Sequence, residues 1–373
     1  MKRALLISLL TVATAISARQ LQIVDVDNMP IAAVCVTNDK GALVGKTDND
    51  GLLKDTKDFD KLYFSHMAFQ SKCVKLDTLS TDRIVLEDAN YNLGEIDVKP
   101  KELIYVQNYY RVTYVCDDGP IYFRAGVVDN TFEAATKKIS SKSRNISRAE
   151  NGLIRFLINT FSGRILNEWA KIDTITNYDR ILKRVNKGIL KLSESVNDRR
   201  IISDSVCSLG YVEDDFKTNR RTLVFDRDTY RQHLREAEEA AKIEKMMREG
   251  KTIKEKDKKK QDADSMAVRD SKLYEVYRID DEGRTGVRDM IMRQLMVSGH
   301  SKRTDHDYVI LIEVFPVTCD YIDKKDFKQT RKDNEVEMNI KELRNFEKNH
   351  NIPPLAPNLK EQIDLLFAKD LAK

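Results

Sequence analysis

The fold of the first hundred residues is decided by the stretch VDVDNMPIAAVCV at residues 24–36 and by the sequence TDNDG at residues 47–51. The first stretch places β-branched residues on both sides of a turn at Pro30, and the second carries the Asp and Gly residues that close a tight turn. Further short apolar runs follow, separated by Asn, Asp, Gly and Lys. The expected strands are residues 21–26, 32–37, 62–65, 73–76 and 83–86. This spacing predicts an all-β sandwich of antiparallel strands.

The beginning of the chain has the order of an export signal. Lys2 and Arg3 precede an apolar stretch at residues 4–12, and small residues follow at 13–18. The apolar stretch is shorter than the roughly 20 residues that cross a bilayer as a helix. We therefore expect residues 1–18 to be a cleaved signal peptide and the mature protein to have no transmembrane segment. The alternative is a buried N-terminal helix.

Length and charge limit the remaining possibilities. A chain of 373 residues suits two or three domains, and its 41% of apolar residues suffices for real cores. The formal net charge is +4, and it falls by two when Lys2 and Arg3 are removed with the signal. So small a charge creates no field that would attract nucleic acid. Nucleic acid is therefore not an expected partner.

The order of turns and strands in residues 19–99 is specific. Asp27 ends a strand, Pro30 leads into the next, and TDNDG is followed by the runs LYFSHMAF at 62–69 and LGEIDV at 93–98. This order resembles the carboxypeptidase regulatory-like domain, a transthyretin-like (prealbumin-like) Greek-key sandwich of about seven strands. The domain occurs at the start of many exported envelope proteins of Gram-negative bacteria, so the resemblance implies a location in the periplasm or at the outer membrane.

The resemblance also implies roles for single residues. Pro30 would begin the second strand, and Asp48 and Gly51 would shape a hairpin turn, with glycine allowing a positive φ. The family's small domain carries no catalytic residues. Ala68 departs from the family pattern, which often has glycine there.

Three motifs imitate functional sites in this region and beyond it. Gly45-Lys46-Thr47 lacks the first glycine of a phosphate-binding loop, because position 40 is Lys. Asp48-Asn49-Asp50-Gly51 lacks the first and last ligands of a calcium loop, so a hairpin turn explains it better. Of the five cysteines, Cys35 and Cys73 lie in strand-like runs where a disulfide is possible, although small buried hydrophobic residues explain them as well.

The sequence around His233 contains a fourth motif of this kind. His233 and Glu236 match the His-x-x-Glu ligand pair of zinc carboxypeptidases, and a third ligand is available nominally from His300, His306 or His350. The surrounding sequence is dense in Arg, Glu and Lys, which is typical of a solvated helix without a pocket. We therefore expect His233 to be an exposed helical residue and not a ligand.

Residues 100–373 alternate strand and helix patterns. A Tyr- and Val-rich strand at 103–116 and its hairpin partner at 121–128 carry aromatic residues that either pack in a sheet or form a ligand platform. Amphipathic helices are expected at 147–169, opened by a Ser147–Glu150 capping box, and at 178–192; each apolar face is core by default, although it can instead dock a partner.

The rest of the chain continues this pattern. Short strands are expected at 201–225, followed by a charged and mobile segment near 229–270. A strand is expected at 273–279, a Met-rich helix or edge element at 287–297, and a strand at 307–315 that is ended by Pro316. The final helix is expected to be capped by Asn358 and Glu361. Together these predict one α+β domain with an antiparallel sheet and packed helices. One arrangement of this kind is a curved half-barrel of the lipoprotein-carrier type.

No catalytic motif accompanies these elements. The chain has five His and five isolated Cys, and it lacks a Gly-x-Ser-x-Gly elbow. We therefore expect a non-catalytic exported cell-envelope protein, without metal or cofactor, that binds or scaffolds through its α+β domain and uses the β-sandwich as a docking or spacer module. The expected partner is an envelope protein, a glycan or a lipid. The alternative is an exported hydrolase whose catalytic residues meet only in the folded chain.

Overall fold

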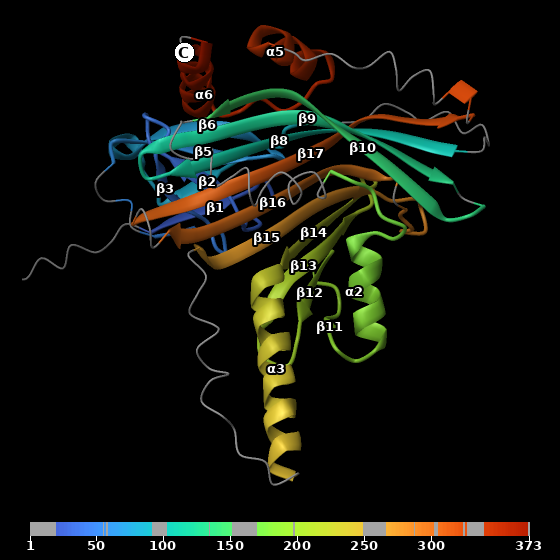
Figure 1. Cartoon of the computed structure of the whole chain (residues 1–373). Helices are drawn as coiled ribbons and strands as arrows, with labels where there is room; N and C mark the ends of the chain where they lie inside the picture. Colours follow the sequence, from blue (N-terminus) through green and yellow to red (C-terminus); the bar gives the residue numbers. More distant parts are fainter. Residues whose placement is uncertain are drawn as a thin grey trace, which may run out of the picture.

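The computed structural model is mostly β, with sheets of predominantly antiparallel strands and a few helices (Figure 1). It describes residues 20–91 except 55, 57 and 58; 103–150 except 134; 170–248 except 197; 266–326 except 287, 302–304 and 324; and 339–371. The expected signal peptide at 1–18 lies outside these residues. No described helix combines the length and the apolar character that a membrane crossing requires.

Seven short strands near the N-terminus form two small sheets, which together we call the N-terminal module. One sheet has the order β4 (Leu52–Leu53), β1 (Leu21–Val24), β7 (Arg83–Val85). The other has the order β3 (Leu43–Lys46), β2 (Cys35–Thr37), β5 (Lys61–His66), β6 (Phe69–Lys75). Apolar residues of both sheets share one core, including Ile23, Val36 and Phe64. The expected strands are present, but β7 pairs with β1 in parallel and not antiparallel.

The turn between β3 and β4 forms as the sequence predicts. The carboxylate of Asp48 accepts hydrogen bonds from the backbone amides of Asp50 and Leu52, and Gly51 has a φ of +69°. A Cβ at Gly51 would lie 2.4 Å from the carbonyl oxygen of Ile23, so only glycine fits. Pro30, in contrast, does not begin the second strand: it forms an isolated bridge to Val24, and β2 starts only at Cys35.

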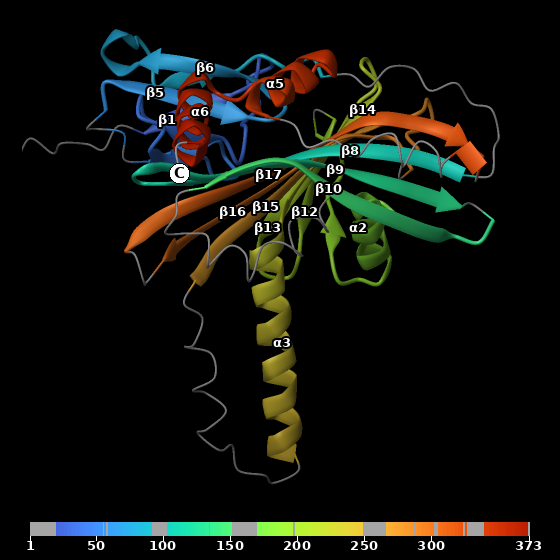
Figure 2. The ribbon, with the colours of Figure 1, turned by 45° about the horizontal axis from the view of Figure 1, so that its top comes forward.

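A single ten-stranded antiparallel sheet makes up most of the remaining chain. Its order is β10 (Lys138–Glu150), β9 (Gly119–Glu133), β8 (Leu103–Cys116), β17 (His306–Ile322), β16 (Met290–Ser301), β15 (Met266–Arg278), β14 (Arg220–Asp226), β13 (Ser208–Asp215), β12 (Arg199–Ser203), β11 (Lys191–Leu192). The longest strands are curved, and the sheet bends as a whole (Figure 2). Neighbouring strands of this sheet are consecutive along the chain except where β17 returns to pair with β8.

Among the described residues, four α-helices lie on the two faces of this sheet. Figure 2 shows α5 (Ile340–Asn349) and α6 (Pro357–Leu371) with the N-terminal module on one face, and α2 (Asn177–Asn186) and α3 (Arg227–Arg248) on the other. The first face is closed by one apolar cluster that joins the module to the sheet and the C-terminal helices, including Met67, Tyr91, Tyr109, Phe315 and Phe367. On the opposite face, Tyr178 and Ile181 of α2 pack with Leu223 and Phe225 of β14.

Two segments that were expected to be a helix, or a helix or edge element, form strands of the large sheet instead. Ser147 and Glu150 do not cap a helix, because they pair with β9 at the end of β10; the rest of the expected helix, residues 151–169, lies outside the described residues. Residues 290–301 form an inner strand between β15 and β17, and not a helix or an edge element. This strand is buried on both faces, so its sequence shows no alternation that would separate strand from helix.

The remaining differences between the expected and the observed elements lie at the ends of a strand and of the helices. Pro316 does not end its strand: β17 runs on to Ile322 with a register shift beside the proline. The second amphipathic helix is shorter than expected and stops before Gly188, which has a φ of +71°. The final helix begins at Pro357, and Asn358 does not cap it but donates hydrogen bonds to Thr37 Oγ1 and Asn38 O of the N-terminal module. The charged segment is helical up to Arg248, and residues 249–265 lie outside the described part.

Candidate functional site

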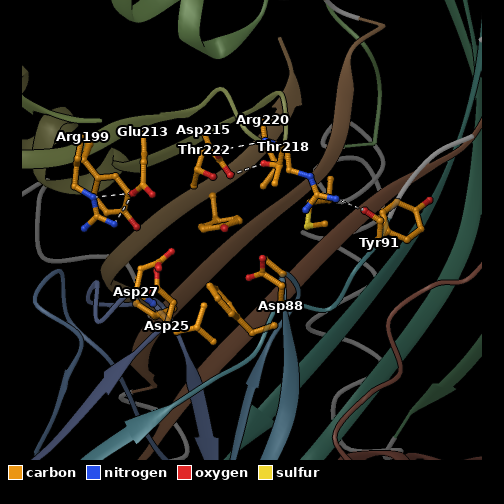
Figure 3. A pocket seen from close by; sticks show the side chains of 18 of the residues that line it. Asp25, Asp27, Asp88, Tyr91, Arg199, Glu213, Asp215, Thr218, Arg220 and Thr222 are labelled. Carbon is orange, nitrogen blue, oxygen red and sulfur yellow. Dashed lines mark hydrogen bonds and ion pairs between the residues drawn. The ribbon is translucent and has the colours of Figure 1, made fainter. Parts of the chain in front are cut away.

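A cleft lies between the N-terminal module and the β12–β14 part of the large sheet (Figure 3). Asp25 and Asp27 come from the loop after β1, and Asp88 follows β7. Across from them stand the side chains of β13 and β14, among them Glu213 and Arg220. Buried Tyr211, Tyr274, Val276 and Met292 from the sheet form part of the lining. The cleft is therefore formed jointly by the N-terminal module and the large sheet.

The space in the cleft is narrow. It encloses a cavity of about 130 Å³, and an adjoining cavity of about 380 Å³ shares Asp88, Asn90, Thr218 and Arg220 with it. A water molecule occupies about 30 Å³ in the liquid, and pockets for drug-sized molecules measure about 300–1,000 Å³. The inner cavity is thus large enough for the end of one side chain, whereas the adjoining one has the size of a small ligand.

Carboxylates outnumber cations on the described lining of the inner cavity. Five carboxylates, Asp25, Asp27, Asp88, Glu213 and Asp215, face two guanidinium groups, Arg199 and Arg220. Arg199 is already paired, since its Nε and Nη2 donate to Glu213 Oε2 at 2.9 and 2.6 Å while its guanidinium lies over the ring of Tyr211. Arg220 Nη2 donates to the carbonyl oxygen of Tyr91 at 3.3 Å. The cleft therefore keeps an excess of negative charge.

The carboxylates differ in how firmly they are held. Asp25 accepts hydrogen bonds from the amides of Asp27 and Met29, and Asp215 accepts from the amides of Lys217 and Thr218 and from the Thr218 hydroxyl. These two side chains shape their own turns. Asp88 accepts no side-chain hydrogen bond from the residues that the structure describes, and in Figure 3 it points into the cleft. The Asp88 carboxylate is thus available to a ligand.

Burial and mutual repulsion disturb the ionisation of these groups. Desolvation raises the pKa of Asp88, and the carboxylates of Asp25, Asp27 and Asp215 raise it further against the opposing effect of Arg220. Desolvation also raises the pKa of Asp25. For Asp215, burial alone would raise the pKa, but its hydrogen bonds outweigh burial and the pKa is lowered. A cation placed among these groups would relieve the repulsion that raises the first two values.

The side chains that could have formed a zinc site do not come together as the sequence motif would require. His233 does not meet Glu236, which accepts a hydrogen bond from Gln232. The Nδ1 atom of His233 lies 2.6 Å from Asp204 Oδ2, beside Cys207. The three histidines that were nominally available as a third ligand are elsewhere: His300 lies beside Asp305 and Asp307, His306 beside Asp117 and Asp118, and His350 stacks on Phe346. The His-x-x-Glu ligand pair is therefore not formed. The expectation that His233 is exposed is wrong, because its side chain lies against Asp204 and is only 18% exposed.

The other sequence candidates also have structural explanations. Cys35 is buried and Cys73 exposed, and both are free thiols. Lys46, from the motif that resembles a phosphate-binding loop, forms an ion pair with Asp270 of β15. Asn49, from the motif that resembles a calcium loop, accepts a hydrogen bond from Lys272 of the same strand. Both motifs therefore attach the N-terminal module to the large sheet. The six aromatic residues that could have formed a ligand platform are instead buried in the sheet; they are Tyr105, Tyr109, Tyr110, Tyr114, Tyr122 and Phe123.

Sequence reasoning did not find the cleft because its residues come from distant segments. Asp25, Asp88 and Arg220 are separated by more than sixty and more than a hundred positions, and none belongs to a motif. The only local signal was the density of Asp in turns, which is common in any β protein.

Comparison with known proteins adds no assignment. A scan of the chain against models of protein families finds no match, and a search of curated proteins finds no relative. Any statement about function therefore rests on the residues and their geometry.

Proposed function

We propose that this protein is a non-catalytic, exported cell-envelope protein that binds a basic side chain, Lys or Arg, of a partner protein in the cleft between the N-terminal module and β12–β14. The observation that carries this proposal is the set of carboxylates around Asp88, whose pKa is raised by desolvation and by like charges. A guanidinium or ammonium group in the inner cavity would offset that repulsion. Figure 3 shows an opening bordered from both sides by these acidic groups.

Export and family are supported by the sequence and by the arrangement of the first strands. The basic, apolar and small residues of 1–18 are ordered as in a signal peptide. Seven strands in two sheets around one core agree with a carboxypeptidase regulatory-like sandwich at residues 19–99. In this proposal the sandwich is a docking module, because it supplies one wall of the binding cleft.

Peptide binding by the full-length mature chain tests the proposal. The probe is a fluorescent tetrapeptide amide with one Arg, and the reference probe has citrulline, which is neutral, in its place. We expect the Arg peptide to bind at least ten-fold more tightly, and Asp88→Asn to weaken its binding about ten-fold. Asp77→Asn, an exposed change on the N-terminal module outside the cleft, should leave binding unchanged. Equal affinity for both peptides, or equal binding by both variants, would contradict the proposal.

A hydrolase is the second candidate, and one observation favours it. A carboxyl group whose pKa is raised in a cleft is a pattern found in general acids, and Asp88 fits this pattern. The binding function is better supported, because the described lining contains no Ser, Cys or His that could act as a nucleophile. Turnover of the Arg peptide that disappears in Asp88→Asn would favour the hydrolase.

A further inference from the structure

Three side chains that bind metals meet at the base of α3, away from the cleft. Asp204 and Cys207 lie in the turn between β12 and β13, and His233 lies in the second turn of α3. One donor atom from each residue lies within 4.8 Å of the other two. These are a carboxylate oxygen, an imidazole nitrogen and a thiol sulfur.

The turn and the helix hold two of the three donors in place. Asp204 Oδ1 accepts hydrogen bonds from the amides of Val206 and Cys207 at 2.8 and 2.9 Å, which fixes the carboxylate and the local backbone. Its other oxygen, Oδ2, lies 2.6 Å from His233 Nδ1. The side chains of Asp204 and His233 are only 8% and 18% exposed. Both groups are therefore preorganised, whereas the exposed Cys207 side chain is accessible from solvent.

We propose that Asp204, Cys207 and His233 bind one Zn²⁺ ion, with water as the fourth ligand. Sulfur, nitrogen and oxygen donors together suit zinc, with bonds of about 2.0–2.3 Å in a tetrahedral arrangement. Such bonds place neighbouring donors about 3.5 Å apart. The 2.6 Å between Asp204 Oδ2 and His233 Nδ1 widens to that value by a small rotation of the imidazole, and rotation of the Cys207 side chain brings its sulfur, now within 4.8 Å, into place. The proton shared by Asp204 and His233 passes to His233 Nε2, so that Nδ1 is free to bind the ion. On binding, the thiol releases its proton to solvent, and thiolate and carboxylate balance the two charges of the ion.

The consequence of zinc binding is structural. In Figures 1 and 2, α3 starts at the sheet and extends far from it. Near its start, Tyr230 packs on Phe225 of β14, and His233 lies one turn further on. A metal ion at His233 would therefore attach the next turn of the helix to the β12–β13 turn. Zinc should therefore increase the free energy needed to separate the start of α3 from the β12–β13 turn.

Metal titration of the full chain tests the site. The protein is reduced, freed of metal with a chelator, and titrated with ZnCl₂ against a chromophoric chelator; cobalt is used in parallel because thiolate ligation gives a charge-transfer band. We expect one Zn²⁺ per chain, at least ten-fold weaker binding in Cys207→Ser and in His233→Ala, and a cobalt–thiolate band that Cys207→Ser abolishes. Cys73→Ser, at the other exposed cysteine, and Glu236→Gln are the matched controls and should bind as the wild type does.

A measurement on the unmodified protein makes the test independent of whether the variants fold. Zinc should slow alkylation of Cys207 by iodoacetamide at least ten-fold and leave the rate at Cys73 unchanged, as read by mass spectrometry of the two peptides. Equal rates at Cys207 with and without zinc would overturn the proposal. So would zinc affinity that is lost in Glu236→Gln, or that survives in Cys207→Ser and His233→Ala.

Discussion

Arg111 of β8 and Glu313 of β17 are directly paired across the sheet and form a buried ion pair with two hydrogen bonds. Arg111 Nε lies 2.6 Å from Glu313 Oε2, and Nη2 lies 3.1 Å from Oε1. The remaining Nη1 donates to the carbonyl oxygen of Pro353 at 2.8 Å, and the Arg111 side chain is only 2% exposed. The same guanidinium thus joins the centre of the sheet to the connection between α5 and α6.

Breaking this pair should strongly destabilise the protein. In Arg111→Met, Glu313 is left buried without its main partner, and we expect the free energy of unfolding to fall by about 3–5 kcal/mol in urea titrations. Lys360→Met removes an exposed partner of Asp364 and should cost less than about 1 kcal/mol. The double variant Arg111→Met/Glu313→Leu should be more stable than Arg111→Met alone. A cost for Arg111→Met as small as that for Lys360→Met would show that the pair does not support the fold.

The stability of the protein should fall between pH 7 and pH 5 because of His66. Burial lowers the pKa of His66 to about 3, and its Nδ1 accepts a hydrogen bond from the amide of Ala68. The imidazole is therefore neutral in the folded state but protonates in the unfolded chain below about pH 6.5. Since the unfolded state then binds more protons, stability is greatest above pH 6.5 and is lost progressively toward pH 3, with a loss of about 2 kcal/mol already at pH 5.

The control for this prediction is His66→Asn, which keeps a hydrogen-bond acceptor but does not titrate in this range. Urea unfolding of both proteins at pH 7 and pH 5 should show a loss about 2 kcal/mol larger in the wild type. Identical pH dependence in the two proteins would mean that His66 is protonated in the folded state.

Two glycines with positive φ should respond differently to alanine. Gly210 in β13 has a φ of +144°, and a Cβ there would lie 2.1 Å from the carbonyl oxygen of Val224 in the neighbouring strand. Gly188 after α2 has a φ of +71°, but a Cβ there meets no atom within 4 Å. We expect Gly210→Ala to cost more than about 3 kcal/mol and Gly188→Ala about 1 kcal/mol, measured by thermal unfolding. Equal costs would show that β14 moves to accept the extra methyl group.

Local sequence predicted those elements whose cause is local. The Asp48–Gly51 turn, the strands of residues 103–116 and the buried face of Leu359, Ile363 and Phe367 follow from side-chain spacing and turn chemistry, and the structure confirms them. Prediction was wrong where both faces of a strand are covered, as at Met290–Val297, because burial on two sides removes the alternation by which a strand is recognised. Ser147 and Glu150 imitate a helix cap but pair with β9 instead.

The sequence alone determined the antiparallel β character of most of the chain, since turns and strand propensities act between residues that are close together. It also contains every residue of the two candidate sites, but it gave no indication of which residues meet. The cleft around Asp88 forms only because the N-terminal module packs on the large sheet, and Cys207 reaches His233 only because α3 returns to the β12–β13 turn. Contacts of this kind depend on which apolar surfaces bury one another across long sequence separations, and that is decided by tertiary packing.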